Sequence, residues 1–243
     1  MGIASVLYGG LFSSLVTCVY MDIAILRGKI HFDWNIAKQI GSYSLPIAIS
    51  SIGITIIHSG DRFFLMRSST MAAVGLYSLA YKIGQLVGYI QVPFETYWDA
   101  QVFHVIRGGD GERHFTRALT YYALALFGGA LFLSLAAAPV LRIATKPDFY
   151  EAAVLVPVVA FAYAIRGPGD YFRSVFAICK QPFRNVIVTA AGVVITVTAY
   201  ATLIPRYHSW GAAVATAITF LGMGTVSYLQ SRRARIFHFE WRR

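Results

Sequence analysis

Residues Ala118–Ala144 read ALTYYALALFGGALFLSLAAAPVLRIA, an apolar stretch whose one charged residue is Arg142. About 20 apolar residues in an α-helix cross the hydrocarbon core of a bilayer. The apolar side chains follow one another without the strict alternation that a membrane-spanning β-strand requires. The stretch therefore predicts a transmembrane helix that is surrounded by lipid rather than water.

The overall composition extends this prediction to the rest of the chain. Of the 243 residues, 57% are hydrophobic and 13% are charged, whereas soluble domains carry about 25% charged residues. Other stretches of sufficient length and apolarity cover Ile3–Leu26, Ser42–Phe64, Ala72–Trp98, Phe149–Lys180, Asn185–Ile204 and Trp210–Gln230. We expect an all-α, polytopic membrane helix bundle with about seven transmembrane helices, the fifth of which is broken at Arg166–Asp170.

The charged residues favour a membrane protein over a nucleic-acid-binding one. The formal net charge is +10, and most lysines and arginines lie in one set of the connections between apolar stretches and in the C-terminal tail. This bias is typical of the cytoplasmic face of a membrane protein. We therefore expect no nucleic-acid partner and a cytoplasmic C-terminus.

Catalytic and metal-binding motifs are absent from the sequence. It contains no P-loop, no GxSxG sequence and no cluster of His, Cys, Asp and Glu at metal-ligand spacing. Cys18 and Cys179 lie in apolar stretches, where they resemble small buried hydrophobic residues. We expect no cofactor, no metal ion and no enzymatic activity.

Polar residues inside the apolar stretches are the main indication of function. A charged side chain near the centre of a membrane helix costs roughly 2.5–3.5 kcal/mol on insertion scales, so it faces a partner or a watery cavity. One face of Ala72–Trp98, about 140° wide, carries Tyr77, Ser78, Tyr81, Lys82, Gln85, Tyr89, Glu95, Thr96 and Asp99. Lys82 has no acidic residue three or four positions away. We expect Lys82 to take part in function.

Two other stretches also gather polar residues on one face. In Ser42–Phe64 these residues are Ser44, Ser51, Thr55, His58, Ser59 and Arg62, with Asp61 beside them. In the fifth stretch Arg166, Asp170 and Arg173 follow at i, i+4 and i+7. Alternative interpretations remain open at this point: His58 as a hydrogen-bonded interior histidine, the tyrosines as packing residues, and Arg166 with Asp170 as a structural ion pair.

The order of several short segments resembles a known family. Tyr43–Pro46 (YSLP), Asp61–Leu65 (DRFFL) and Val74–Lys82 (VGLYSLAYK) resemble the seventh and eighth helices of bacterial polysaccharide flippases of the O-antigen and teichoic-acid type. Leu203–Tyr207 (LIPRY) and Gly211–Ala213 resemble the turn between the last two helices of that family. These flippases belong to the multidrug/oligosaccharidyl-lipid/polysaccharide exporter superfamily, whose members have two six-helix lobes around a central cavity.

The resemblance implies a domain organisation for the chain. Residues 1–39 would be the last helix of a first lobe with a cytoplasmic linker, residues 40–231 the six-helix C-terminal lobe, and residues 232–243 a basic cytoplasmic tail. We expect a partial transporter that needs an N-terminal lobe or a second copy of itself. A truncated gene product without activity is the alternative.

The resemblance also implies a function and a site. The expected function is translocation of polyprenyl-diphosphate-linked oligosaccharide across the bacterial plasma membrane, with membrane lipids as further partners. Lys82, Arg62 and Arg166 would meet the pyrophosphate, and Tyr77, Tyr81, Gln85 and Tyr89 the sugars. His58 completes the expected site.

Two other function classes are considered. The first is a multidrug/cation antiporter, a class that generally couples transport to ions through buried carboxylates. The second is a membrane-embedded glycosyltransferase, for which Glu95 and Asp99 are the candidate acidic residues.

Overall fold

The computed structural model describes residues 3–26, 33–107, 111–178, 181 and 183–233. The regular elements among these residues are α-helices and short 3₁₀ segments. The chain divides into two compact units, residues 1–43 and 44–243. The all-α prediction is confirmed.

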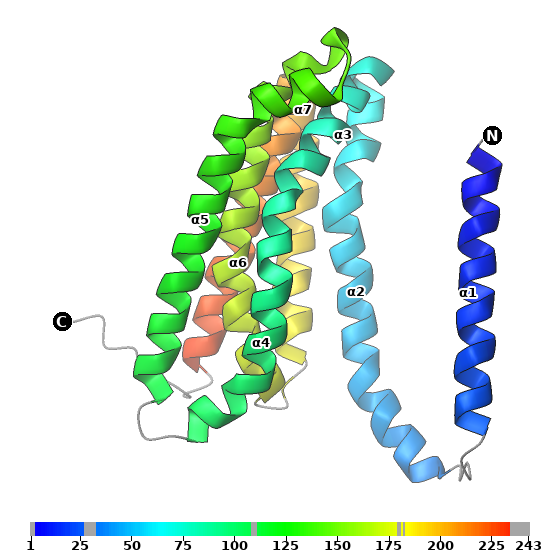
Figure 1. Ribbon diagram of the computed structural model, residues 1–243. Coiled ribbons are helices and arrows are strands. Elements are labelled where there is room, and N and C mark those ends of the chain that lie inside the picture. Colours follow the sequence, from blue (N-terminus) through cyan, green and yellow to red (C-terminus); the bar gives the residue numbers. More distant parts are fainter. Residues whose placement is uncertain (1–2, 27–32, 108–110, 179–180, 182, 234–243) are drawn as a thin grey trace. The chain divides into compact units, whose positions relative to one another are not determined.

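Helix α1 (Ile3–Leu26) lies in the first unit, and α2 (Trp34–Ser68) begins there and continues into the second. Asp33 caps α2, because its Oδ1 atom accepts a hydrogen bond of 2.8 Å from the backbone N–H of Asn35. The remaining elements, drawn in Figure 1, are α3 (Met71–Gly84), η1 (Gln85–Val87), α4 (Gly88–Arg107), α5 (Gly111–Ala144), η2 (Pro147–Val154), α6 (Val156–Ile178) and α7 (Phe183–Arg233).

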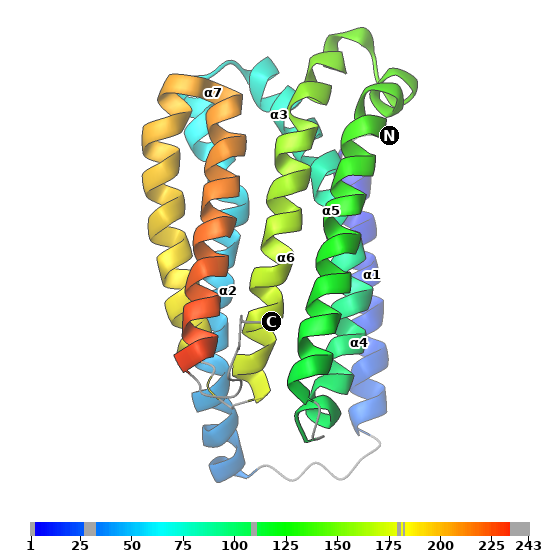
Figure 2. The ribbon, with the colours of Figure 1, turned by 90° about the vertical axis from the view of Figure 1, so that its left-hand side faces the viewer.

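Long apolar helices make this a membrane protein. Within the described residues α2, α5 and α7 are each long and apolar enough to span a bilayer, and η2 with α6 forms a further span with a bend of 44°. Helix α7 contains both of the last two predicted stretches. It is interrupted at His208, whose φ of 49° and ψ of −124° are not helical, and the chain reverses there into a hairpin (Figure 2). This backbone is unusual for a residue with a Cβ atom.

Two details of the predicted spans are corrected. The expected break at Arg166–Asp170 is wrong, because α6 is continuous through it with Pro168 inside the helix. Packing against neighbouring helices lets a membrane helix keep its course through proline and glycine, and α6 packs on α3, α4, α5 and α7. The stretch Ala72–Trp98, in contrast, is not one α-helix, because η1 separates α3 from α4.

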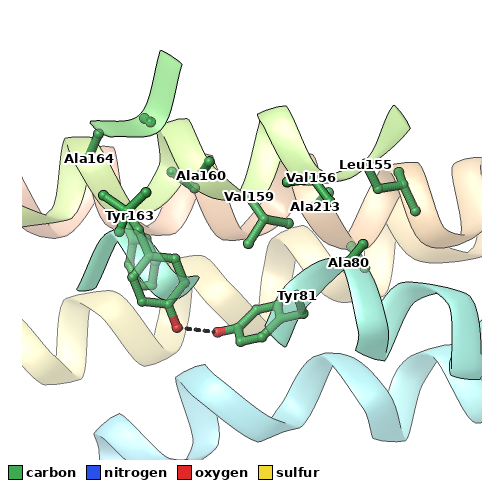
Figure 3. Packing of buried hydrophobic residues seen from close by; sticks show 14 of the residues in the cluster. Ala80, Tyr81, Leu155, Val156, Val159, Ala160, Tyr163, Ala164 and Ala213 are labelled. Carbon is green, nitrogen blue, oxygen red and sulfur yellow. Dashed lines mark hydrogen bonds between the residues drawn. The ribbon is translucent and has the colours of Figure 1, made fainter. Parts of the chain in front are cut away.

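Buried valines and alanines, together with one glycine, pack α6 closely against its neighbours in the second unit. Val156, Val159 and Ala160 of α6 are fully buried, and Ala80 of α3 and Ala213 of α7 are buried in the same cluster (Figure 3). A Cβ atom placed on Gly84 would lie 2.6 Å from Cβ of Val159 and 3.0 Å from the backbone nitrogen of Ala160. Glycine therefore sets the distance between α3 and α6.

A pair of glycine substitutions tests this packing. Gly84→Ala should destabilise the second unit by about 1–3 kcal/mol, because the new methyl group would overlap the Val159 side chain and lie tightly against the backbone nitrogen of Ala160. Gly75→Ala on the same helix meets no atom within 4 Å, so it should be neutral or stabilise by up to about 1 kcal/mol through helix propensity. Thermal unfolding of both variants in detergent measures the difference, and equal midpoints would contradict the close contact.

Candidate functional site

A hydrogen-bonded network joins α2, α3 and α6 inside the second unit. The Nδ1 atom of His58 lies 3.1 Å from the Tyr81 hydroxyl, and its Nε2 atom lies 3.1 Å from Nη1 of Arg166. Tyr163 donates a hydrogen bond of 3.0 Å to the Tyr81 hydroxyl, as the dashed line in Figure 3 shows. A guanidinium group can only donate, so Nε2 of His58 accepts and the ring proton sits on Nδ1.

Aromatic rings surround this network. The guanidinium carbon of Arg166 lies 5.8 Å from the ring centroid of Tyr163 and 5.6 Å from that of Phe220. The guanidinium carbon of Arg62 lies 5.6 Å from the ring of Tyr81. These distances suit cation–π attraction, which strengthens where water is excluded. The rings therefore help to keep two cations inside an apolar bundle.

Asp170 is shared by two arginines. Its Oδ2 atom accepts from Nε of Arg166 at 2.8 Å, and its Oδ1 atom accepts from Nη1 of Arg173 at 3.2 Å. The side chains of Arg166, Asp170 and Arg173 are 28%, 17% and 16% exposed. Arg173 also donates to the amide oxygen of Asn185 on α7 at 3.2 Å. Arg166 and Asp170 do form an ion pair, and the group keeps one net positive charge.

Asp61 is a buried carboxylate that the sequence interpretation did not place in the site. It is 0% exposed. Its Oδ2 atom accepts from the Tyr77 hydroxyl at 2.6 Å, and its Oδ1 atom accepts from the backbone N–H of Arg62 at 2.7 Å. In the described part of the chain Asp61 forms no ion pair. The burial of Asp61 could have been predicted from its spacing along the helix. The buried residues of α2 are Ser50, Gly53, Ile57, Asp61 and Leu65.

The polar face predicted on residues 72–98 is divided by the structure. Tyr77 and Tyr81 are buried against α2 and α6, whereas Lys82 and Tyr89 are exposed and Gln85 is half-buried. An arc of about 140° is wider than one helix contact, so its two edges meet different surroundings. Lys82 and Tyr89 therefore lie apart from the network that contains His58 and Arg166.

Helix α2 is divided in a similar way. Ser51, Thr55 and Ser59 are exposed, while His58 and Arg62 are half-buried. The hydroxyls of Ser51 and Thr55 donate to backbone carbonyls one turn earlier, each at 3.0 Å. The exposed edges of α2 and α3 thus present hydroxyl groups and the Lys82 ammonium on the surface of the second unit.

The acidic pair considered for a glycosyltransferase is described only in part. Glu95 is half-buried on α4, and the side chain of Asp99 lies outside the described residues, as does Cys179. Among the side chains that the structure describes, no three His, Cys, Asp or Glu residues are grouped as metal ligands.

Comparison with known proteins gives one family. Residues 1–92 match the family described as "Polysaccharide biosynthesis protein". This points to polysaccharide synthesis or export. The matched region contains α1, α2 and α3, and so includes His58, Asp61, Tyr77 and Lys82. No curated protein and no solved structure matches the chain. The coarse part of the resemblance, a polysaccharide biosynthesis protein of the flippase type, is thereby supported.

Proposed function

We propose that this protein translocates polyprenyl-diphosphate-linked oligosaccharide across the bacterial plasma membrane, as a transporter rather than an enzyme. The observation that carries the proposal is Lys82, an exposed cation on an apolar helix within the region that matches polysaccharide biosynthesis proteins. In the described part of the chain Lys82 forms no ion pair. A cation in this setting needs an anionic partner or water, and the pyrophosphate of the substrate supplies the anion.

The side chains of the second unit divide into two roles under this proposal. Lys82 and Arg62 bind the pyrophosphate, and Gln85 and Tyr89 bind the sugars through hydrogen bonds and stacking. Four residues hold α2, α3 and α6 together and so position the first group. They are His58, Tyr77, Tyr81 and Arg166.

The polyprenyl tail requires an apolar surface, and the second unit offers one. An open groove of about 450 Å³ lies between α5, α6 and α7. Its lining includes Leu119, Ala123, Ile165, Phe172, Leu221 and Tyr228. A branched hydrocarbon chain in this groove would remain in contact with the protein while the glycan crosses on a polar path.

The exposed polar edges of α2 and α3 require a partner surface. Contact of Lys82 with hydrocarbon would cost several kcal/mol, so a first lobe or a second copy of the chain covers this surface in our proposal. Transport then proceeds by rocking one bundle against the other around a cavity. The C-terminus faces the cytoplasm, as the distribution of basic residues predicts.

The function is tested by the sidedness of the lipid-linked oligosaccharide in spheroplasts. Without the protein, the intermediate should accumulate with its glycan protected from an impermeant oxidant, and re-expression should restore oxidation. If cells without the protein do not make the lipid-linked oligosaccharide at all, the protein acts in its synthesis. The flippase proposal would then be wrong, and the glycosyltransferase function would take its place.

A multidrug/cation antiporter is the second candidate, and the burial of Asp61 is the observation that favours it. Asp61→Asn keeps an acceptor for the Tyr77 hydroxyl but cannot change its charge. If the protein is an antiporter, this variant should lose both resistance to lipophilic cations and the proton release that those cations cause in proteoliposomes. Asp148→Asn, an exposed change in η2, serves as the control. Resistance unaffected by Asp61→Asn would remove this candidate.

A further inference from the structure

His58 makes the side-chain hydrogen bonds that join α2 to α6 among the described residues. Its Nε2 atom contacts Nη1 of Arg166 at 3.1 Å, and its Nδ1 atom lies 3.4 Å from the Tyr163 hydroxyl. The imidazole is half-buried, and the Phe220 ring of α7 lies 5.8 Å from it, measured between centroids. The side-chain hydrogen bonds between α2 and α6 in this part of the chain therefore depend on the protonation state of one imidazole ring.

Each of the two ring nitrogens of His58 has a defined role in this arrangement. Arg166 has only donors and stays charged, so Nε2 must present a lone pair to it. The ring proton is then on Nδ1 and points to the Tyr81 hydroxyl at 3.1 Å. A second proton can bind only at Nε2, the atom that faces the guanidinium group.

Protonation is incompatible with the contact for two reasons. It would place an N–H donor against another N–H donor, and it would bring an imidazolium to 3.1 Å from a guanidinium. Asp170 cannot relieve this repulsion alone, because its single negative charge is already shared between Arg166 and Arg173. The other groups that face or flank the ring are the Tyr81 and Tyr163 hydroxyls and, on α2 itself, Asp61 and Arg62. Asp61 is occupied by the hydroxyl of Tyr77 and the backbone N–H of Arg62.

We propose that His58 is the proton-binding residue that couples proton movement to the conformational change of this transporter. The present structure is the proton-free state, in which α2 is held on α6. Uptake of one proton at Nε2 releases α2 from Arg166, and the return of α2 to α6 expels that proton. The coupling to transport rests on the proposed function, whereas the proton-dependent release of α2 does not.

Distance measurements between the two helices test the proposal without any substrate. Spin labels are attached at Ser59→Cys on α2 and Ile165→Cys on α6, with Cys18 and Cys179 replaced by serine. The full chain in lipid nanodiscs is measured at about pH 8 and about pH 5, the range in which histidine changes charge. We expect a second, longer distance population in acid that disappears when the pH is raised again.

Two variants separate the role of His58 from a general effect of acid. Asparagine at position 58 carries a neutral amide that does not titrate, so in His58→Asn the distance distribution should be the same at both pH values. In Arg166→Gln the new amide can donate or accept, so either form of His58 can bind it and the acid-induced population should shrink. An acid-induced longer population that persists in His58→Asn would overturn the proposal.

The transport arm uses lipid-linked oligosaccharide in proteoliposomes with and without a pH gradient. We expect the gradient to accelerate translocation by the wild-type protein and to have no effect on His58→Asn. If the protein moves no such substrate but its helices still respond to acid through His58, the proposed function fails and the proton site stands. If translocation proceeds and the variant keeps its full response to the gradient, the proton site fails alone.

Discussion

Asp170→Asn is expected to destabilise the second unit by about 3–5 kcal/mol, which is the usual result of breaking a buried ion pair from one side. Asp170 accepts from Arg166 at 2.8 Å and from Arg173 at 3.2 Å, and the three side chains are mostly shielded from solvent. The variant removes from two guanidinium groups in an apolar helix bundle the carboxylate that they share. Thermal unfolding in detergent, followed by tryptophan fluorescence, measures the loss.

Removal of one arginine should cost less than removal of the shared acid. Arg173→Gln leaves the Arg166–Asp170 pair intact, so a loss of about 1–3 kcal/mol is expected. Asp148→Asn makes the same chemical change at an exposed position of η2 and should stay within about 0.5 kcal/mol of the wild type. If Asp170→Asn unfolds at the same temperature as Asp148→Asn, the shared carboxylate does not stabilise α6.

This ion-pair group was predictable from the sequence because it depends on one helix. Arg166, Asp170 and Arg173 follow at i, i+4 and i+7, so helical geometry alone places them on one face. The same local reasoning expected a break at Arg166–Asp170, which is wrong because α6 is continuous there. Whether proline and glycine interrupt a helix depends on the helices packed around it, and the local sequence of α6 does not contain that information.

Most features of the site that were not predicted from the sequence depend on contacts between helices. Asp61 and Tyr77 lie on different helices, and the pattern of α2 does not show that a hydroxyl on α3 stands 2.6 Å away. Likewise, Tyr81 and Lys82 are adjacent in sequence and share one polar arc, yet the first is buried and the second is exposed. Helical periodicity predicted the polar face of residues 72–98. Which part of that face is buried depends on where α6 packs against it.

The exposure of Lys82 leads to the second large effect. If Lys82 binds the pyrophosphate, Lys82→Met removes a charge-assisted interaction of about 1.5–3 kcal/mol, which corresponds to roughly 10- to 150-fold weaker apparent affinity. Methionine keeps the length and suits an apolar helix. The protein should therefore reach the membrane in normal amounts while polysaccharide export falls severely, a combination measured by complementation together with immunoblotting of membranes.

Two further variants distinguish a loss of charge from a loss of structure. Lys82→Arg retains the cation and should restore much of the export, whereas Lys146→Met removes an exposed lysine between α5 and η2 and should leave export unchanged. Lys82 forms no ion pair among the described residues, so its substitution breaks no ion pair inside the second unit, whereas substitution of Asp170 breaks two. Reduced export in Lys82→Met would thus report on a partner outside the second unit. Normal export in that variant would exclude Lys82 from the substrate path and would leave Arg62 as the remaining candidate for the pyrophosphate.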